Sequence, residues 1–300
     1  MKKLKKRLLV SILILSIIAF ALGYVLLIHV APYAIIKPPR TSKKINPDDF
    51  NLNYEQLNIA GKDSVQLATY WIKSELDTTK AIIITLHGIG DVKETFLSFS
   101  KLLAQNGYAS ILLDHRAQGK SGGQYCTFGY KEKEDIQKVI DFVQAIDQQT
   151  PIGILGHSLG GAIALQALEL DQRIAFGIIQ STFMDLHQIV YDYKKRLLFG
   201  IGSHWVTNLV LRQAGKIAQF DPHVVKPIES AKEIEQPILL IHGEADDRIR
   251  VDYGKALFEQ LQSEQKELFI VPEAGHNDVA SIAGKQYLER VFQFLERIKM

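Results

Sequence analysis

Short apolar runs rich in β-branched residues recur along this chain, separated by amphipathic stretches of helical length. The runs lack polar–apolar alternation, which is typical of parallel strands covered on both faces. We expect strands at 81–86, 109–113, 152–155, 176–179, 238–241 and 268–271, after an opening hairpin of 54–59 and 65–72, and helices at 94–105, 133–146, 159–170, 253–261 and 282–298. The pattern predicts an α/β protein with a mostly parallel eight-stranded sheet and helices on both faces.

The N-terminal segment has a different pattern. Residues 8–31 form a run of 24 residues without formal charge when His29 is taken as neutral. As a helix with about 1.5 Å per residue this run extends roughly 36 Å, enough to cross a hydrocarbon core of about 30 Å. We therefore expect a transmembrane anchor over residues 1–36, a linker over 37–50 and the folded domain over 51–300. The alternatives are a cleaved signal peptide, with its cleavage site near residues 19–21, and a buried core helix.

Charge is distributed unevenly between these parts. The chain has 35 Lys and Arg and 33 Asp and Glu, but nine of the bases and none of the acids fall within residues 1–44. A nucleic-acid-binding domain concentrates basic charge on its folded part, so we expect no nucleic-acid partner. Five bases precede the apolar run and four follow it, a slight bias that favours a cytosolic N-terminus and an extracytoplasmic domain. The oligomeric state is left open.

Residues 182–227 interrupt the alternation of strands and helices. They place about 45 residues between two expected strands, where about two to six are usual. The stretch contains Phe183, Tyr191, Tyr193 and Trp205, which is too apolar for a flexible linker. Because an insertion after a late strand lies where the carboxyl ends of the strands open, we expect a helical cap over a site. A set of ordinary surface helices is the alternative.

One motif places a serine between an expected strand and an expected helix. Gly156-His157-Ser158-Leu159-Gly160 has the form G-x-S-x-G. A serine on such a sharp turn needs glycine neighbours, because the backbone is strained and crowded there. The turn also exposes the hydroxyl at a helix N-terminus, which favours a developing negative charge. Ser158 is therefore the candidate nucleophile.

A base and an acid must accompany this serine, because a free hydroxyl is a poor nucleophile. His276 follows the expected strand 268–271, and Asp246 and Asp247 follow the strand before it. The order serine, acid, histidine is the one associated with this sheet architecture. The pattern predicts a catalytic triad that takes its acid from the loop after strand 238–241.

At these motifs the chain resembles the α/β-hydrolase superfamily, most closely the serine-aminopeptidase-like and monoacylglycerol-lipase-like hydrolases, which include membrane-anchored members. Residues 87–93 (HGIGDVK) match H-G-x-G-x-x-K, residues 114–123 (DHRAQGKSGG) match D-x-R-G-x-G-x-S-x-G except at Ala117, and residues 242–249 (HGEADDRI) match H-G-x-x-D-x-x-[VI]. The resemblance implies an α/β-hydrolase fold and makes Asp246 the acid of the triad. It also implies that the backbone N–H groups of Ile89 and Leu159 form the oxyanion hole.

We predict a membrane-anchored serine hydrolase that cleaves a carboxylic ester, lipid-like or acyl, through an acyl-enzyme. The chain has no metal-ligand motif, phosphate-binding loop or dinucleotide fingerprint, so we expect neither a metal nor a cofactor. Cys126 is expected to be inert. A serine peptidase or a thioesterase of the same fold is the alternative, and a peptidase would need acids such as Asp185, Asp192 or Glu229 around a peptide amine. A non-catalytic membrane-tethered binding protein is the alternative from a different class.

Overall fold

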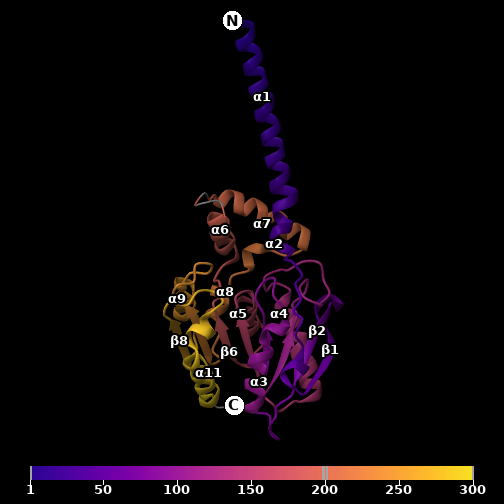
Figure 1. The fold of residues 1–300 in the computed structure, drawn as a ribbon, viewed down its shortest axis with the longest axis vertical. Coiled ribbons are helices and arrows are strands. Elements are labelled where there is room, and N and C mark those ends of the chain that lie inside the picture. The colour runs from indigo at the N-terminus through magenta and orange to yellow at the C-terminus, as the bar shows by residue number, and fades with distance from the viewer. Residues whose placement is uncertain (1, 198–199, 201, 299–300) are drawn as a thin grey trace.

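The computed structural model describes residues 2–197, 200 and 202–298 (Figure 1). Eight strands form one sheet in the order β1-β2-β4-β3-β5-β6-β7-β8. Their bounds are Tyr54–Ala60 (β1), Gln66–Ile72 (β2), Ala81–Leu86 (β3), Tyr108–Leu113 (β4), Ile152–His157 (β5), Ile174–Gln180 (β6), Ile238–Gly243 (β7) and Lys266–Val271 (β8). The β1–β2 and β2–β4 pairs are antiparallel, and the remaining pairs are parallel. The predicted α/β-hydrolase fold with a mostly parallel eight-stranded sheet is confirmed.

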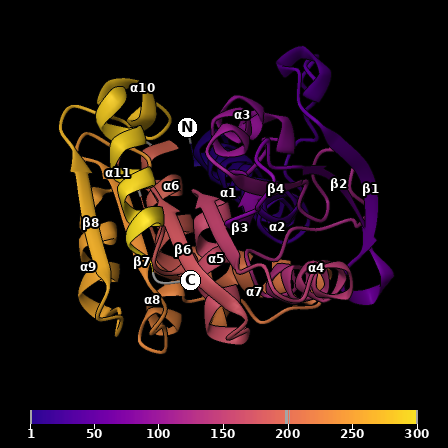
Figure 2. The same ribbon diagram turned by 90° about the horizontal axis from the view of Figure 1, so that it is seen from below.

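Helices cover both faces of the sheet (Figure 2). They are α3 (Leu97–Gln105), α4 (Glu132–Ile146), α5 (Leu159–Leu170), α9 (Val251–Gln260), α10 (Val279–Ala283) and α11 (Lys285–Arg297). Successive residues of one strand point into different cores: Ile82 and Ile84 pack in the cluster with α4, α5 and α9, whereas Ile83 packs in the cluster with α3 and α11. This two-sided burial explains why the strands are apolar throughout.

The C-terminal helix differs from the prediction. A single helix was expected over 282–298, but the structure has α10 and α11, which meet at Gly284. Gly284 has φ 53° and ψ −123°, a backbone conformation that glycine adopts readily and other residues rarely. The apolar periodicity runs across this glycine, so the pattern alone did not show the break.

The insertion between β6 and β7 is helical. It contains α6 (Leu186–Leu197), α7 (His204–Ala218), a 3₁₀ turn (Pro222–Val224) and the start of α8 (Pro227–Ala231). Phe183, Ile189 and Val210 from this insertion share a cavity with Ser158, which directly follows β5. The insertion therefore lies over the carboxyl ends of the parallel strands, at the end of the domain from which α1 departs (Figure 1).

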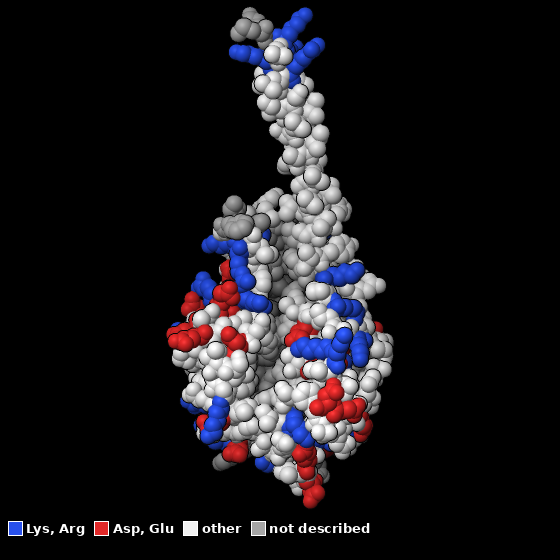
Figure 3. Space-filling model, in the orientation of Figure 1, with Lys and Arg blue, Asp and Glu red and all other residues white. Residues whose placement is uncertain are grey.

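The N-terminal segment is one long helical column made of α1 (Lys2–Val25), a π-helical turn (Leu26–Val30) and α2 (Ala31–Ile36). Pro32 lacks the N–H that would bond the carbonyl of Ile28, which accounts for the widened turn just before it. Lys3–Ile36 is long and apolar enough to cross a membrane. The uncharged part of this helix extends away from the domain, and basic side chains cluster at its free end (Figure 3).

The stretch expected to be a linker lies against the domain. The Arg40 guanidinium donates hydrogen bonds to the carbonyls of Gly119 (2.9 Å), Ser121 (2.6 Å) and Gly123 (3.0 Å). The Cys126 N–H also donates to the carbonyl of the last residue of α2, at 2.8 Å. These bonds join the base of the N-terminal helix to the loop that follows β4.

Candidate active site

Ser158 lies on a strained turn between β5 and α5. Its backbone has φ 56° and ψ −116°, an uncommon conformation for a residue with a side chain. A Cβ on Gly156 would lie 2.3 Å from the Gly160 carbonyl oxygen, and one on Gly160 would lie 2.0 Å from the Leu86 carbonyl oxygen. Only glycine fits at both positions, so the G-x-S-x-G spacing follows from backbone crowding.

The structure brings Ser158, His276 and Asp246 into one hydrogen-bonded chain. Ser158 Oγ lies 3.0 Å from His276 Nε2, and His276 Nδ1 lies 2.7 Å from Asp246 Oδ2. All three residues are at most 6% exposed. Because a carboxylate can only accept, Nδ1 carries the proton and Nε2 is free to accept the serine proton. This is the geometry of a nucleophile, a base and an orienting acid.

The loop after β7 selects Asp246 over its neighbour Asp247. Asp246 Oδ1 accepts the backbone N–H groups of Arg248 (2.9 Å) and Ile249 (2.8 Å). Burial alone would raise the pKa of Asp246, but its hydrogen bonds with His276 and the two N–H groups outweigh burial and lower that pKa. Asp247 instead faces solvent and pairs with Arg196. Asp246 is thus held ionised with its second oxygen on the histidine.

The two residues expected to form the oxyanion hole flank the serine. Ile89 and Leu159 both line a cavity with Ser158. Within the described part of the chain, no protein acceptor occurs for either backbone N–H. The loop of Ile89 is held from both sides, because the Gly90 N–H donates to Gln118 Oε1 (2.6 Å) and Thr41 Oγ1 donates to the Gly90 carbonyl (2.7 Å). Neither N–H group is therefore committed to another protein group, and both residues line the cavity that Ser158 also lines.

Three other histidines near the site bond to backbone carbonyls. His157 Nε2 donates to the His276 carbonyl (3.1 Å), His87 Nδ1 to the Gly88 carbonyl (2.8 Å) and His242 Nε2 to the Ile249 carbonyl (2.8 Å). Burial lowers the pKa of all three, that of His157 to about 4. These rings are neutral at physiological pH and organise the loops around the triad.

Two cavities meet at Ser158, and Ile89 and Tyr193 line both of them. One has a volume of about 520 Å³ and an apolar lining. It is bounded by the insertion, with Phe183, Ile189, Val190, Val206 and Val210, and by the N-terminal helix, with Leu27, Ala31, Ala34 and Ile35. The other has about 490 Å³ and a more polar lining that includes His87, Asp91, Arg248 and Asn277. Sequence reasoning named Tyr193 only as part of the insertion and contained Arg248 only as a variable position of the motif at 242–249. It gave the four helix residues no place at the site, because they belong to no motif.

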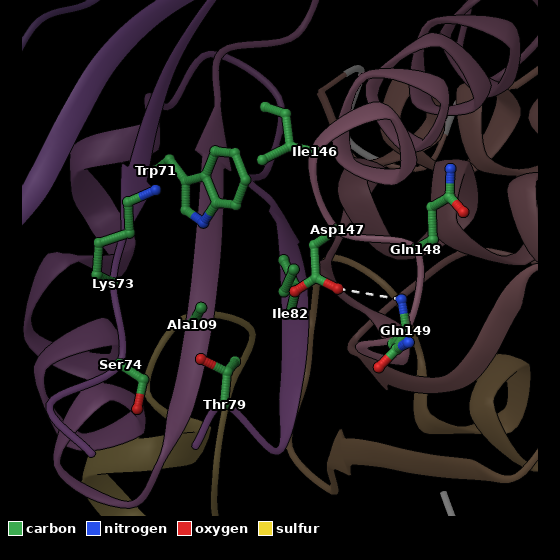
Figure 4. Close-up of a pocket in the computed structure, with 10 residues that line it drawn as sticks. All are labelled: Trp71, Lys73, Ser74, Thr79, Ile82, Ala109, Ile146, Asp147, Gln148 and Gln149. Atoms are coloured by element: carbon green, nitrogen blue, oxygen red, sulfur yellow. Dashed lines mark hydrogen bonds between the residues drawn. The ribbon is translucent and has the colours of Figure 1, made fainter. Parts of the chain in front are cut away.

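A third cavity of about 560 Å³ lies elsewhere (Figure 4). Ile82 and Ala109, near the starts of β3 and β4, line it, as does Asp147 from the segment before β5. It is therefore at the amino ends of the parallel strands, whereas sites in such sheets form at the carboxyl ends. We do not assign the candidate site to it.

The structure also shows the surroundings of Cys126 and of the residues that could bind a metal ion. Burial, together with Glu132, raises the pKa of the Cys126 thiol well above its usual value, which leaves the thiol protonated and unreactive. Across residues 2–197, 200 and 202–298, no group of three or more His, Cys, Asp or Glu residues could hold a metal ion.

Comparison with known proteins identifies the family. The serine aminopeptidase S33 family model matches residues 77–230. An uncharacterized protein of Bacillus subtilis, YqkD, is 27% identical over 74% of this chain and 73% of its own length. The yeast uncharacterized membrane protein YNL320W is 23% identical over 77% of this chain and 76% of its own length. The structure of a Pyrococcus furiosus esterase superposes with a TM-score of 0.75 at 24% identity, covering 89% of this chain and all of that one. The chain belongs to the serine aminopeptidase S33 family of α/β-hydrolases.

Proposed function

We propose that this protein is a serine esterase whose triad is Ser158, His276 and Asp246. The observation that carries the proposal is the position of the Ser158 hydroxyl, 3.0 Å from the free nitrogen of His276 and at the junction of an apolar and a polar cavity. An ester with an apolar acyl chain and a polar alcohol would fill both cavities with its carbonyl at the serine.

The reaction begins with acyl transfer to the serine. Ser158 Oγ attacks the ester carbonyl carbon while His276 Nε2 accepts the hydroxyl proton. The N–H groups of Ile89 and Leu159 stabilise the oxyanion that forms, and losing one such donor costs about 10²–10³-fold in rate. The tetrahedral intermediate then collapses, the C–O bond to the alcohol breaks, and His276 gives its proton to the departing oxygen.

Hydrolysis of the acyl-enzyme repeats the same steps with water. His276 accepts a proton from water as the water oxygen attacks the acyl carbonyl, and then returns that proton to Ser158 Oγ as the acid leaves. Asp246 holds the imidazole in the required tautomer and stabilises it while it is charged. The side chains present are sufficient for both half-reactions.

The peptidase alternative is supported by the family description but less by the cavities. Asp192 bonds with Tyr253 and Gln188, and Glu229 pairs with Lys232. Neither these two acids nor Asp185 lines the cavities at Ser158. A peptide amine would find no carboxylate among those three, and Asp91, which does line the polar cavity, already pairs with Lys43. Both observations favour an ester or thioester over a peptide.

A fluorophosphonate probe tests the proposal on the full chain in detergent. We expect the probe to label the wild type but not Ser158→Ala. Ser98→Ala is the matched control, because Ser98 also lines the polar cavity, whereas the hydrogen bond of His276 Nε2 goes to Ser158. The control should label like the wild type. Esters of rising acyl length, a thioester and an aminoacyl amide then rank the substrate classes. Absence of labelling in the wild type would favour a membrane-tethered binding protein instead.

We also propose that the N-terminal helix is retained as a single-pass anchor and that the domain faces away from the cytosol. The uncharged, exposed helix and the tighter basic cluster before it support this arrangement. Protease added to intact cells should digest the domain and leave the N-terminus protected. Protection of the domain would reverse the orientation.

A further inference from the structure

The apolar cavity at Ser158 has a wall that comes from the N-terminal helix. Leu27, Ala31, Ala34 and Ile35 line it, and they repeat at the spacing of one helix face. Pro32 and Ile36 of the same helix are buried, and Ile36 packs in the core cluster with α4, α5 and α9. The residues that continue the membrane helix thus also face the candidate nucleophile.

This wall is held firmly in place. α7 of the insertion packs against both α2 and the π-helical turn. The bond from the Cys126 N–H to the carbonyl of Ile36 and the bonds from Arg40 to three carbonyls fix the base of the helix. The cavity is therefore formed in part by the anchor itself, and the anchor is not a free tether.

The length of the helix places the bilayer next to the cavity. The uncharged run begins at Leu8, and crossing a hydrocarbon core of about 30 Å takes about 20 residues. Counted from Leu8, that span ends near Leu27. Leu27 is the first residue along the helix that lines the cavity, so the cavity starts where the hydrocarbon core ends.

The neighbouring surface also fits contact with a membrane. The end of α6 and the beginning of α7 lie at the end of the domain from which α1 departs (Figure 1). Leu197 and Trp205, at those two helix ends, are 74% and 70% exposed. Lys195 and Arg196 directly precede Leu197 in the last turn of α6, and Arg196 also pairs with Asp247. Aromatic and basic side chains together are typical of a membrane interface. The molecule is hollowed between the insertion and the base of the N-terminal helix (Figure 3).

We propose that α2 and the π-helical turn form one wall of the acyl pocket, and that the substrate is a long-chain ester that passes from the bilayer directly into this pocket. The inference rests on the proposed esterase function and specifies the substrate of the same site. The acyl chain moves from the hydrocarbon of the bilayer into the apolar cavity without passing through water. The polar alcohol stays in the polar cavity, on the other side of Ser158.

An alanine-to-tryptophan exchange on the cavity wall tests the proposal in the full chain reconstituted into phosphatidylcholine vesicles. The readout is the ratio of kcat/KM for a palmitoyl ester to kcat/KM for a butyryl ester of the same alcohol. Ala34→Trp should lower this ratio by about tenfold or more, because steric exclusion of chain atoms from an apolar pocket has effects of this size. Ala21→Trp, on the part of the same helix outside the cavity, should leave it unchanged. An unchanged ratio in Ala34→Trp, or equal loss on both esters, would overturn the proposal.

A second measurement uses the wild type and needs no variant to fold. A palmitoyl-length fluorophosphonate with a diazirine near its chain end is attached to Ser158 and then irradiated. We expect cross-links to the peptide that contains residues 27–35, and cross-links confined to other segments would contradict the inference. Labelling with a short fluorophosphonate is measured in parallel. If the short probe fails to label the wild type, the esterase proposal itself fails, whereas short-probe labelling without cross-links to residues 27–35 overturns only the anchor wall.

Discussion

The two sides of Ser158 are built in different ways. The triad side consists of loops at the carboxyl ends of β5, β7 and β8, joined by hydrogen bonds of 2.7–3.0 Å between side chains that the sequence analysis named. The apolar side is assembled mainly from the N-terminal helix and the insertion, whose residues belong to no motif. For the proposed esterase, the comparison assigns the chemistry to a few exact contacts and the choice of substrate to surfaces supplied by distant segments.

The largest expected effect is on the triad side. Ser158→Ala should lower kcat for a short-chain ester by about 10⁶-fold, the size of effect seen when a serine nucleophile is removed from a triad. The variant should keep the melting temperature of the wild type to within a few degrees, measured by circular dichroism. Activity within tenfold of the wild type would show that Ser158 is not the nucleophile.

The neighbouring acids Asp246 and Asp247 provide a second test of the triad side. Asp246→Asn should lower kcat by about 10⁴-fold, because an amide can hold the histidine in the wrong tautomer. Asp247→Asn is the matched control and should remain within about twofold, because that side chain is exposed and a surface ion pair contributes little. Steady-state kinetics on one ester decides between them. Similar losses of kcat in both variants would show that the activity depends on the conformation of the loop and not on the Asp246 carboxylate.

The apolar side is tested at the hydrogen bonds of Arg40, which hold the base of the N-terminal helix and are called the clamp below. Arg40→Ala removes three close hydrogen bonds to backbone carbonyls, at about 1–3 kcal/mol of stability for bonds from a charged donor. The melting temperature should fall by about 2–4 °C per kcal/mol lost, and the palmitoyl-to-butyryl ratio should fall with it. Arg250→Ala removes an exposed arginine paired with Asp252 and should change neither. A ratio that stays constant in Arg40→Ala would show that the clamp does not support the pocket.

The smallest expected effect is the dependence of folding stability on pH, which comes from buried histidines in the loops around the triad. Burial lowers the pKa of His87, His115, His157 and His242, so the unfolded chain binds more protons than the folded one below the ordinary value of 6.5. Stability therefore falls as the pH is lowered from 6.5 toward about 4. The lowered pKa of Asp246 adds stability that is lost only nearer its ordinary value of 3.8.

Thermal unfolding of the full chain in detergent at pH 7.5 and 5.5 measures this effect. The loss of melting temperature between the two should be smaller in His115→Gln than in the wild type. His204→Gln, at an exposed ring, should leave it unchanged. An identical loss in His115→Gln and the wild type would assign the pH dependence to other groups.

Much of the fold followed from local patterns. The apolar runs and the opening hairpin located the strands of the sheet, and the glycines around Ser158 marked the turn, because these patterns reflect what a residue meets within a few positions along the chain. The break at Gly284 was missed, since the apolar periodicity continues through it. The expected linker was also found against the domain, because the bonds of Arg40 go to residues about 80 positions away.

By itself, the sequence determined the sheet, the serine turn, the order of serine, acid and histidine, and a helix long enough to cross a membrane. These properties depend on side-chain periodicity, backbone strain and length, which are local. Only the tertiary structure decided that Leu27, Ala31, Ala34 and Ile35 face Ser158 across one cavity. The physical reason is that a contact between segments more than 100 residues apart depends on how the whole domain packs, and no local pattern of residues records it.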